Sequence, residues 1–372
     1  MASKSAIEWT DATWNPIVGC TIVSPGCTNC YAMKMAARIE AMNHGRHAPH
    51  APTPKAIPAS LYDGLTKPSK GGPVWTGDVR LADDRTLTAP LRWNRPRKIF
   101  VNSMGDLFHE SVPDEWIDRV FAVMALAPQH TFQVLTKRSK RMREYVSSRL
   151  AGHITRPISR LTDELKHKWK SSHHIYIDHK YFFSENMLVV DPQYYAGTIR
   201  MIDFTNGVII PNIWLGVSAE DQPRADERRD DLASLAAQGW ITFVSYEPAL
   251  KLVDWTGWDF LKQLISGGES GPNACPSHPD WHRAARDFCA AHGIAYFFKQ
   301  WGAWVPVVDR ERDDPDWRKD YSSRYGERAS IRWLNLAGGR GFHGERFHVM
   351  GRVGKANAGR LLDGVEHNGM PS

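Results

Sequence analysis

Six short apolar runs recur along the chain, and each is followed by polar residues. They cover residues 99–102, 131–136, 213–217, 241–245, 264–266 and 294–298. The runs are almost continuously apolar instead of alternating, which is typical of parallel strands buried on both faces of a sheet. The pattern therefore predicts a parallel sheet whose strands end in polar loops.

Helical patterns separate several of these runs. One opens at 113–115 (Pro-Asp-Glu), and two others cover 224–237 and 279–292. Alternating strands and helices predict βαβ units with right-handed crossovers, and hence an α/β fold. Both an open doubly wound sheet and a barrel satisfy this pattern, so periodicity alone does not choose between them.

Two stretches interrupt the alternation. Residues 43–79 are rich in Pro, Gly, His and Lys and are expected to form a surface excursion. Residues 139–211 are too long for a simple crossover and are expected to form an inserted subdomain. A single barrel over 1–306 then fits the length, and the charged, Gly-rich residues 307–372 are expected to form a C-terminal extension that packs on it. The histidines between His44 and His50 are expected to belong to a plain loop and not to a metal site.

Three of the five cysteines, Cys20, Cys27 and Cys30, lie within eleven residues and have the spacing C-x6-C-x2-C. Thiolate sulfur favours iron–sulfur clusters or zinc. A structural zinc needs four protein ligands, and the fourth would have to be Cys275 or a histidine. Three cysteines leave one corner of a cubane cluster open. A cluster is therefore favoured, with zinc and unligated thiols as alternatives.

Residues 7–32 (IEWTDATWNPIVGCTIVSPGCTNCYA) resemble the start of a phage-associated, largely uncharacterised family placed in the radical S-adenosylmethionine superfamily. The resemblance continues in the segments VNSM and DLF at 101–108, FQVLTKR at 132–138, NIWLGVSAE at 212–220, SYEP at 245–248, GGESGP at 267–272, FFKQWG at 297–302 and in 351–363. It implies a partial (β/α)6 TIM-like barrel, a [4Fe-4S] cluster held by Cys20, Cys27 and Cys30, and S-adenosyl-L-methionine as co-substrate. The commonest superfamily spacing is C-x3-C-x2-C, from which this chain departs.

In such a barrel the active site lies at the carboxyl ends of the strands. Candidates for cofactor binding there are Asn102, Ser103, Asp106, Ser218, Gly267, Gly268 and Glu269. The two glycines would let the backbone approach a ligand, and Glu269 would take the amino group of the cofactor. Glu220 and Glu247 are candidates for an acid/base pair, and Lys137 with Arg138 for binding a carboxylate or phosphate. Thr136, Ser270, Lys299 and Gln300 complete the polar strand ends.

Composition and net charge bear on the partners and the location of the protein. The formal charge of +6 permits nucleic-acid binding without requiring it. No apolar run is long enough for a membrane helix and no secretory signal is recognisable, so a cytoplasmic location is expected. The leading hypothesis is reductive cleavage of S-adenosylmethionine to a 5′-deoxyadenosyl radical that repairs or modifies a nucleobase in DNA or RNA. An electron donor such as a flavodoxin or ferredoxin would be a partner, and Cys275 is a candidate hydrogen donor.

Two alternatives remain open. One keeps the radical chemistry but directs it at a peptide or small metabolite. The other is a nucleic-acid-binding protein with a structural zinc or an inert cluster, which would cleave no cofactor.

Overall fold

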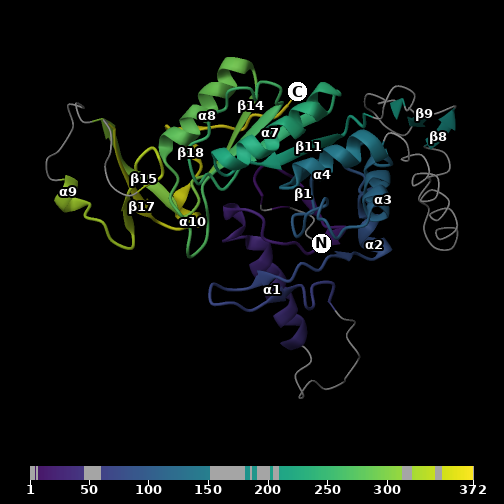
Figure 1. The fold of residues 1–372 in the computed structure, drawn as a ribbon, viewed down its shortest axis with the longest axis horizontal. Helices are drawn as coiled ribbons and strands as arrows, with labels where there is room; N and C mark the ends of the chain where they lie inside the picture. Colours follow the sequence, from purple (N-terminus) through teal and green to yellow (C-terminus); the bar gives the residue numbers. More distant parts are fainter. Residues whose placement is uncertain are drawn as a thin grey trace. The chain divides into compact units, whose positions relative to one another are not determined.

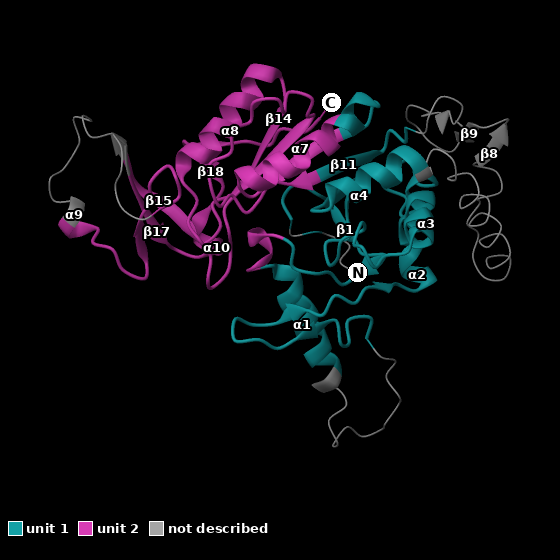
Figure 2. Cartoon of the chain, in the orientation of Figure 1, with its two compact units in different colours: residues 1–23, 30–216, 234–241 teal, residues 24–29, 217–233, 242–372 magenta. Residues whose placement is uncertain are grey.

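The computed structural model describes residues 5, 7–45, 60–150, 181–184, 187–190, 202–203, 209–311, 321–339 and 346–371. The chain forms two compact units, shown in Figure 2. Unit 1 comprises Met1–Val23, Cys30–Gly216 and Ser234–Ile241, and unit 2 comprises Ser24–Asn29, Val217–Ala233 and Thr242–Ser372. The cysteine motif is thus divided, because Cys27 belongs to unit 2 while Cys20 and Cys30 belong to unit 1.

The central sheet contains seven strands in the order β1-β6-β7-β11-β12-β13-β14 (Figure 1). Their bounds are Ala12–Trp14, Lys98–Val101, Thr131–Thr136, Ile213–Ser218, Ile241–Tyr246, Gln263–Gly267 and Ala295–Gln300. The pairs β1–β6, β6–β7, β12–β13 and β13–β14 are parallel. The predicted α/β class and all six predicted strands are confirmed. The count of six was wrong, because β1 is too short to stand out as an apolar run.

A small core of unit 1 is built on α1 (Tyr31–Gly45). The hairpin of β3 (Thr66–Lys67) and β4 (Val74–Trp75) contacts this helix, and Leu65 and Trp75 are buried in the shared cluster. The described part of the expected surface excursion therefore contributes to a core. Residues 46–59 lie outside the described residues.

The other helices of unit 1 follow the strand ends. The predicted helix after Pro113 is α3 (Asp114–Ala125), with two acidic residues in its first turn that favour the helix dipole. Its Phe121 packs between Phe108 and Tyr145. The remaining short elements are β2 (Ile17–Val18), β5 (Arg80–Leu81), α2 (Asp84–Leu87), η2 (Ala89–Arg92), α4 (Ser139–Glu144) and η3 (Tyr145–Leu150).

Part of the insertion at 139–211 is described. It contains an antiparallel sheet in the order β10-β9-β8, formed by Ile202–Asp203, Met187–Val190 and Tyr181–Ser184. Most of the insertion, including its basic residues 166–170, lies outside the described residues.

Unit 2 carries the segment η1 (Pro25–Cys27), α7 (Gln222–Ala237, which ends in unit 1) and α8 (Pro279–His292). Both long helices were predicted, and α8 ends at Gly293, whose φ of 65° is the left-handed conformation that glycine adopts without strain. A second, antiparallel sheet has the order β15-β17-β16, formed by Trp304–Glu311, Arg346–Arg352 and Ile331–Trp333. In it Asp309 of β15 lies directly opposite His348 of β17.

The end of the chain lies along β14. Its elements are α10 (Lys355–Ala358), β18 (Leu361–Leu362) and β19 (Val365–Glu366), whereas α9 (Tyr321–Arg324) comes earlier, between β15 and β16. The indole of Trp301 donates to the carbonyl of Leu361 at 2.8 Å, and the amide of Gln263 donates to that of Gly369 at 2.9 Å. Among the described residues, no helix has the length and apolar character that a membrane crossing requires.

Candidate functional site

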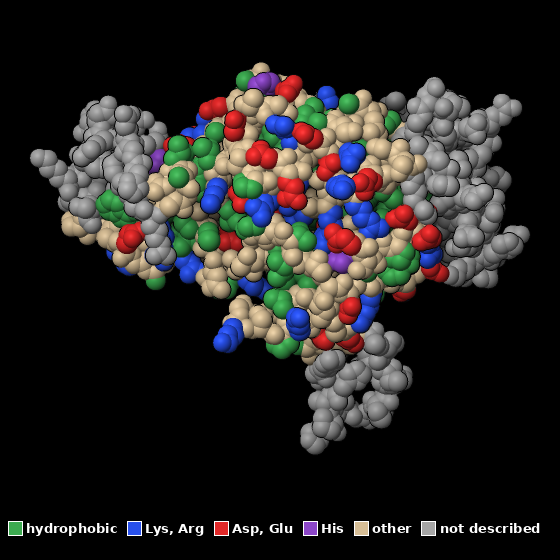
Figure 3. All heavy atoms as spheres, viewed as in Figure 1, with side chains coloured by type: hydrophobic (Ala, Val, Ile, Leu, Met, Phe, Trp, Pro, Cys, Tyr) green, Lys and Arg blue, Asp and Glu red, His purple; other side chains and the backbone are tan. Residues whose placement is uncertain are grey.

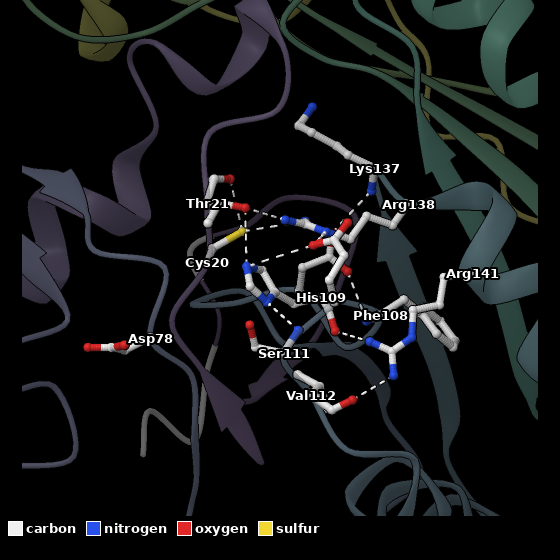
Figure 4. Close-up of polar contacts among 12 residues, drawn as sticks. Cys20, Thr21, Asp78, Phe108, His109, Ser111, Val112, Lys137, Arg138 and Arg141 are labelled. Atoms are coloured by element: carbon white, nitrogen blue, oxygen red, sulfur yellow. Dashed lines mark hydrogen bonds and ion pairs between the residues drawn. The ribbon is translucent and has the colours of Figure 1, made fainter.

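In unit 1, the sulfur of Cys20 lies beside a buried arginine (Figure 4). Nη1 of Arg138 donates to Cys20 Sγ at 3.7 Å, and Nη2 donates to the hydroxyl of Thr21 at 2.6 Å. Arg138 follows β7 and is only 7% exposed. A fixed cation next to a cysteine favours its thiolate, the form that binds metals. That Arg138 belongs to a functional site stays a prediction, and the structure gives Cys20 as its partner.

Two carboxylates compensate the charge of Arg138. Asp106 Oδ2 accepts from Nη1 at 2.9 Å, and Glu110 Oε2 accepts from Nε at 2.8 Å. Burial alone would lower the pKa of Arg138, but Asp106, Cys20 and Glu110 together raise it above its usual value. The guanidinium is therefore a permanent cation in this position.

Asp106 organises the end of β7. Its carboxylate accepts hydrogen bonds from the hydroxyl of Thr136 at 2.7 Å and from the backbone N–H groups of Phe108 and Lys137 at 3.0 and 3.3 Å. These bonds and the arginine occupy a carboxylate that is 5% exposed. Asp106 is thus a positioning residue for Arg138. The side chain of Lys137 extends away from this cluster (Figure 4).

Asn102 and Ser103 follow β6. Asn102 has a φ of 58°, and its Oδ1 accepts from the backbone N–H of Ile17 at 3.2 Å. Its Nδ2 is buried without a hydrogen-bond partner among the described residues, so this side chain retains a donor. The carbonyl of Ser103 accepts from the hydroxyl of Tyr31, the residue after Cys30, at 2.7 Å. Ser103 therefore contacts the residue after Cys30, and Asn102 contacts β2, which precedes Cys20.

In unit 2, the segment that carries Cys27 is held by Glu220, which follows β11. Ser24 donates to Glu220 Oε1 at 2.5 Å, and the backbone N–H of Cys27 donates to the carbonyl of Ser24 at 2.9 Å. A Cβ atom on Gly26 would lie 2.6 Å from the side chain of Glu220. The turn before Cys27 therefore needs glycine because Glu220 packs directly against it.

Glu269, which follows β13, holds the other end of the same segment. Its Oε1 accepts from Nδ2 of Asn29 at 3.0 Å, and Oε2 accepts from the backbone N–H of Cys275 at 2.8 Å. Asn29 also donates to the carbonyl of Asn273 at 3.2 Å. The carboxylate predicted to take a cofactor amino group thus already binds the residue before Cys30.

The two glutamates predicted as an acid/base pair each have their own cation. Glu220 is fully buried and accepts from Arg228 at 2.8 Å, while Arg228 also donates to the carbonyl of Ser218 at 2.7 Å. Glu247 accepts from Nζ of Lys299 at 2.6 Å, and both side chains are partly exposed. Glu220 is consequently a positioning residue, and Glu247 with Lys299 is the more accessible pair.

The glycines after β13 have a packing role. A Cβ atom on Gly268 would lie 2.1 Å from the carbonyl oxygen of Trp301, and one on Gly267 would lie 3.4 Å from that of Gln300. The close approach for which these glycines were predicted therefore occurs between β13 and the end of β14, within the protein itself.

The two remaining cysteines differ from the motif cysteines in that the pKa of each thiol is raised. Cys289 is buried in α8, and burial raises the pKa of its thiol to about 12. Cys275 is exposed, and its pKa is raised mainly by partial burial and by Glu269. The environments of both thiols therefore disfavour the thiolate, in contrast to that of Cys20 beside Arg138.

A comparison with protein families matches residues 4–371 to "Protein of unknown function (DUF5131)". The chain belongs to this family. No curated protein and no solved structure matches it.

The expected membership in the radical S-adenosylmethionine superfamily was wrong. The family model that matches the chain, over residues 4–371, is one of unknown function and not a radical S-adenosylmethionine family. The motif Cys20, Cys27 and Cys30 also lacks the C-x3-C-x2-C arrangement of that superfamily.

Sequence reasoning missed the residues that hold the motif in place. Ser24 and Asn29 lie inside the motif, but their partners Glu220 and Glu269 are 196 and 240 residues away in the sequence, and no local signal links them. It also missed a group formed by His278, Asp280 and His348, whose ligand atoms lie within 4.8 Å of one another. The signal for part of this group was the His-Pro-Asp start of α8. The sequence between His44 and His50 lies almost entirely outside the described residues.

Proposed function

We propose that this protein is an iron–sulfur enzyme whose cluster is held by Cys20, Cys27 and Cys30. The observation that carries the proposal is the hydrogen bond from buried Arg138 to Cys20, because a guanidinium that donates to a sulfur favours its thiolate. The proposal rests on these residues and not on family membership.

The surroundings of the cysteines fit a thiolate-bound cluster. Cys20 and Cys30 are ten residues apart and pack against the same apolar cluster of unit 1, which includes Met33 and Met104. Cys27 is three residues before Cys30, and its segment is anchored within unit 2 by Glu220 and Glu269. Apolar packing and hydrogen bonds to sulfur are the features by which proteins tune such clusters.

A zinc site is less well supported. A structural zinc needs four protein ligands, whereas the motif supplies three cysteines. The group His278, Asp280 and His348, whose ligand atoms lie within 4.8 Å of one another, contains no cysteine.

A three-cysteine cluster would supply an open iron able to bind S-adenosylmethionine and deliver the electron that cleaves it. The chain's own contribution is orientation and charge. Arg138 balances the thiolate of Cys20, Asn102 offers a buried amide donor at the end of β6, and Lys299 with Glu247 forms a partly exposed ion pair at the strand ends of unit 2. We infer that the strands form a partial barrel, because seven strands follow one another in sequence order.

For the substrate we propose a nucleobase in DNA or RNA, with a peptide or small metabolite as the competing class. The support is the net charge of +6. Basic and acidic side chains are interspersed over the face drawn in Figure 3, so the preference rests on net charge and not on a patch seen there. An electron donor such as a flavodoxin or ferredoxin is the proposed partner.

The test is iron and sulfide analysis with electron paramagnetic resonance on anaerobically reconstituted protein, with and without S-adenosylmethionine. We expect about four irons per chain, a spectrum that changes when the cofactor is added, and release of 5′-deoxyadenosine under reduction. Cys20→Ser, Cys27→Ser and Cys30→Ser should each lose the cluster. The matched control is Cys289→Ser, which should keep it because that thiol is buried within α8, outside the motif.

Three results would separate the alternatives. Bound zinc in place of iron, or a cluster whose spectrum ignores the cofactor, would overturn the proposed chemistry and favour the nucleic-acid-binding protein. Cofactor cleavage that is unaffected by DNA or RNA, with no salt-dependent nucleic-acid binding, would keep the enzyme and reject the nucleobase.

A further inference from the structure

Unit 2 contains a second cluster of metal-ligating side chains that is independent of the cysteine motif. His278 and Asp280 lie at the start of α8, and His348 lies on β17. His348 Nε2 is 3.8 Å from Asp280 Oδ2, and His278 Nδ1 is 3.8 Å from the same oxygen. Asp309 of β15 joins them, because cross-strand pairing brings its Oδ1 to 2.8 Å from His348 Nε2.

These separations suit a single small cation. Nitrogen and carboxylate oxygen bind Zn²⁺ at about 2.0–2.2 Å, so two atoms bound to one ion lie about 3–4 Å apart. The three measured separations span 2.8 to 3.8 Å. Only small side-chain adjustments would therefore bring these atoms around one ion.

The imidazole of His348 supplies an independent indication of a ligand. It is 2% exposed, and neither ring nitrogen makes a hydrogen bond within the part of the chain that the structure describes. The contact of Nε2 with Asp309 is close but lacks hydrogen-bond geometry. Buried polar atoms are normally satisfied, so a nitrogen that faces two carboxylate oxygens without a hydrogen bond suits the binding of a cation.

Arg283 orients the carboxylates toward this position. Its Nη1 donates to Oδ1 of Asp280 at 2.8 Å, and its Nη2 donates to Oδ2 of Asp309. The opposite oxygens, Asp280 Oδ2 and Asp309 Oδ1, are the ones near His348. Asp363 also binds Arg283, so three carboxylates surround this one guanidinium. Groups that hold the far side of a ligand in this way are typical of metal sites.

We propose that His348, Asp280 and Asp309, with His278 as fourth ligand, bind a divalent transition-metal ion, with Zn²⁺ as the best match. Imidazole and carboxylate together favour Zn²⁺ over Mg²⁺ or Ca²⁺, which prefer all-oxygen sites. His278 Nδ1 now accepts the N–H of Asp280 at 3.1 Å, so its binding would exchange a helix-capping hydrogen bond for a metal bond.

The site is closed and its role is structural. Both histidines are buried, and the ligands come from α8, β15 and β17. Sites with four protein ligands stabilise folds, whereas catalytic sites keep an open position. The ion would fasten the antiparallel sheet of unit 2 to the start of α8.

The test uses the full chain with Cys20, Cys27 and Cys30 all changed to Ser, so that the cysteine motif does not contribute. After equilibrium dialysis against ZnCl₂, elemental analysis should find one zinc per chain, and the thermal unfolding midpoint should rise with zinc concentration. Adding His348→Gln or Asp309→Asn should weaken zinc binding at least tenfold. His292→Gln, an exposed histidine at the other end of α8, is the matched control and should bind as the parent does.

Binding is compared only between proteins with equal unfolding midpoints in EDTA, and two separate variants guard against a misfolded one. No zinc in the cysteine-free chain, or equal affinity in the parent and in both variants, would overturn the site. Neither result depends on whether the cysteine motif holds a cluster, so the two proposals fail separately.

Discussion

The two units contact their parts of the cysteine motif through different kinds of groups. In unit 1 a cation, Arg138, contacts the sulfur of Cys20 itself. In unit 2 two carboxylates, Glu220 and Glu269, bind the residues beside the cysteines, Ser24 and Asn29. The first arrangement sets the charge of a ligand atom, and the second sets the path of the backbone.

This difference assigns separate tasks to residues that look alike in the sequence. All of them are polar groups that follow apolar strands, which made them equal candidates for catalysis. Asp106 and Glu220 are both buried and bound to arginines, and so act through other residues. The comparison can be tested by removing one kind of support at a time.

The largest effect is expected for Arg138→Met. It leaves Asp106 as a buried, unpaired carboxylate, and breaking a buried pair costs about 3–5 kcal/mol of unfolding free energy. Denaturant unfolding measures this, and iron analysis after reconstitution should also show a loss. Arg141→Met, within α4 and bound to half-exposed Asp114, should cost clearly less. Equal losses in both variants would mean that Arg138 has no special place beside Cys20.

Glu220→Gln should come next, with a loss of about 3 kcal/mol. Gln keeps hydrogen bonding to Ser24 but leaves Arg228, which is 1% exposed, without its counter-charge. Because Ser24 keeps its hydrogen bond in Glu220→Gln, this variant should lose stability but retain most of its iron. Ser24→Ala should show the opposite, a larger loss of iron and a smaller loss of stability. Denaturant unfolding and iron analysis of the two variants measure both losses. A Glu220→Gln protein with full stability would show that the buried pair is not needed.

The main sheet was predictable from sequence because its strands are buried on both faces and therefore read as unbroken apolar runs. Strand β1 escaped prediction, since Ala12–Trp14 gives only three residues of signal. The hairpin β3–β4 was read as a surface loop because its Gly and Lys residues outweigh the two buried side chains, Leu65 and Trp75.

The position of the candidate residues at strand ends was predictable, but the role of each residue was not. Strand ends identified Asp106, Arg138, Glu220 and Glu269, since polar residues at those ends share one edge of a parallel sheet. The sequence could not show that Glu220 pairs with Arg228, because Glu220 precedes α7 and Arg228 lies within it, eight residues on, outside the i+3 and i+4 spacings of helix neighbours. The His348 cluster needs a strand pairing that no local pattern reveals.

Acid should weaken unit 1 through His130, a residue remote in sequence from the cysteine motif. Burial, with a smaller contribution from Arg97, lowers the pKa of His130 from 6.5 to about 4. As pH falls below 6.5 the unfolded chain takes up a proton that the folded chain refuses until about pH 4. Stability therefore falls through this window, by roughly 2 kcal/mol between pH 7 and pH 5.

The measurement is the difference in unfolding free energy between the parent and His130→Gln at each pH. Gln can still donate to the carbonyl of Pro90, the present partner at 3.1 Å, and cannot titrate. The difference removes contributions from other buried histidines. A pH dependence that is the same in both proteins would show that His130 is not the group responsible.

The smallest effect is expected for Asn29→Ala, which removes a backbone support in unit 2 and leaves the contact between Arg138 and Cys20 in place. The side chain is partly exposed and makes one hydrogen bond to Glu269 and one to a carbonyl, so its loss should cost only about 1 kcal/mol. Iron content should nevertheless fall, because the path between Cys27 and Cys30 loosens. Asn29→Asp should lower iron further, since it places a second carboxylate against Glu269. Thr28→Ala, an exposed neighbour outside both supports, should keep full iron content. If Asn29→Ala retains as much iron as Thr28→Ala, the carboxylates of unit 2 hold the fold alone and only Arg138 serves the motif.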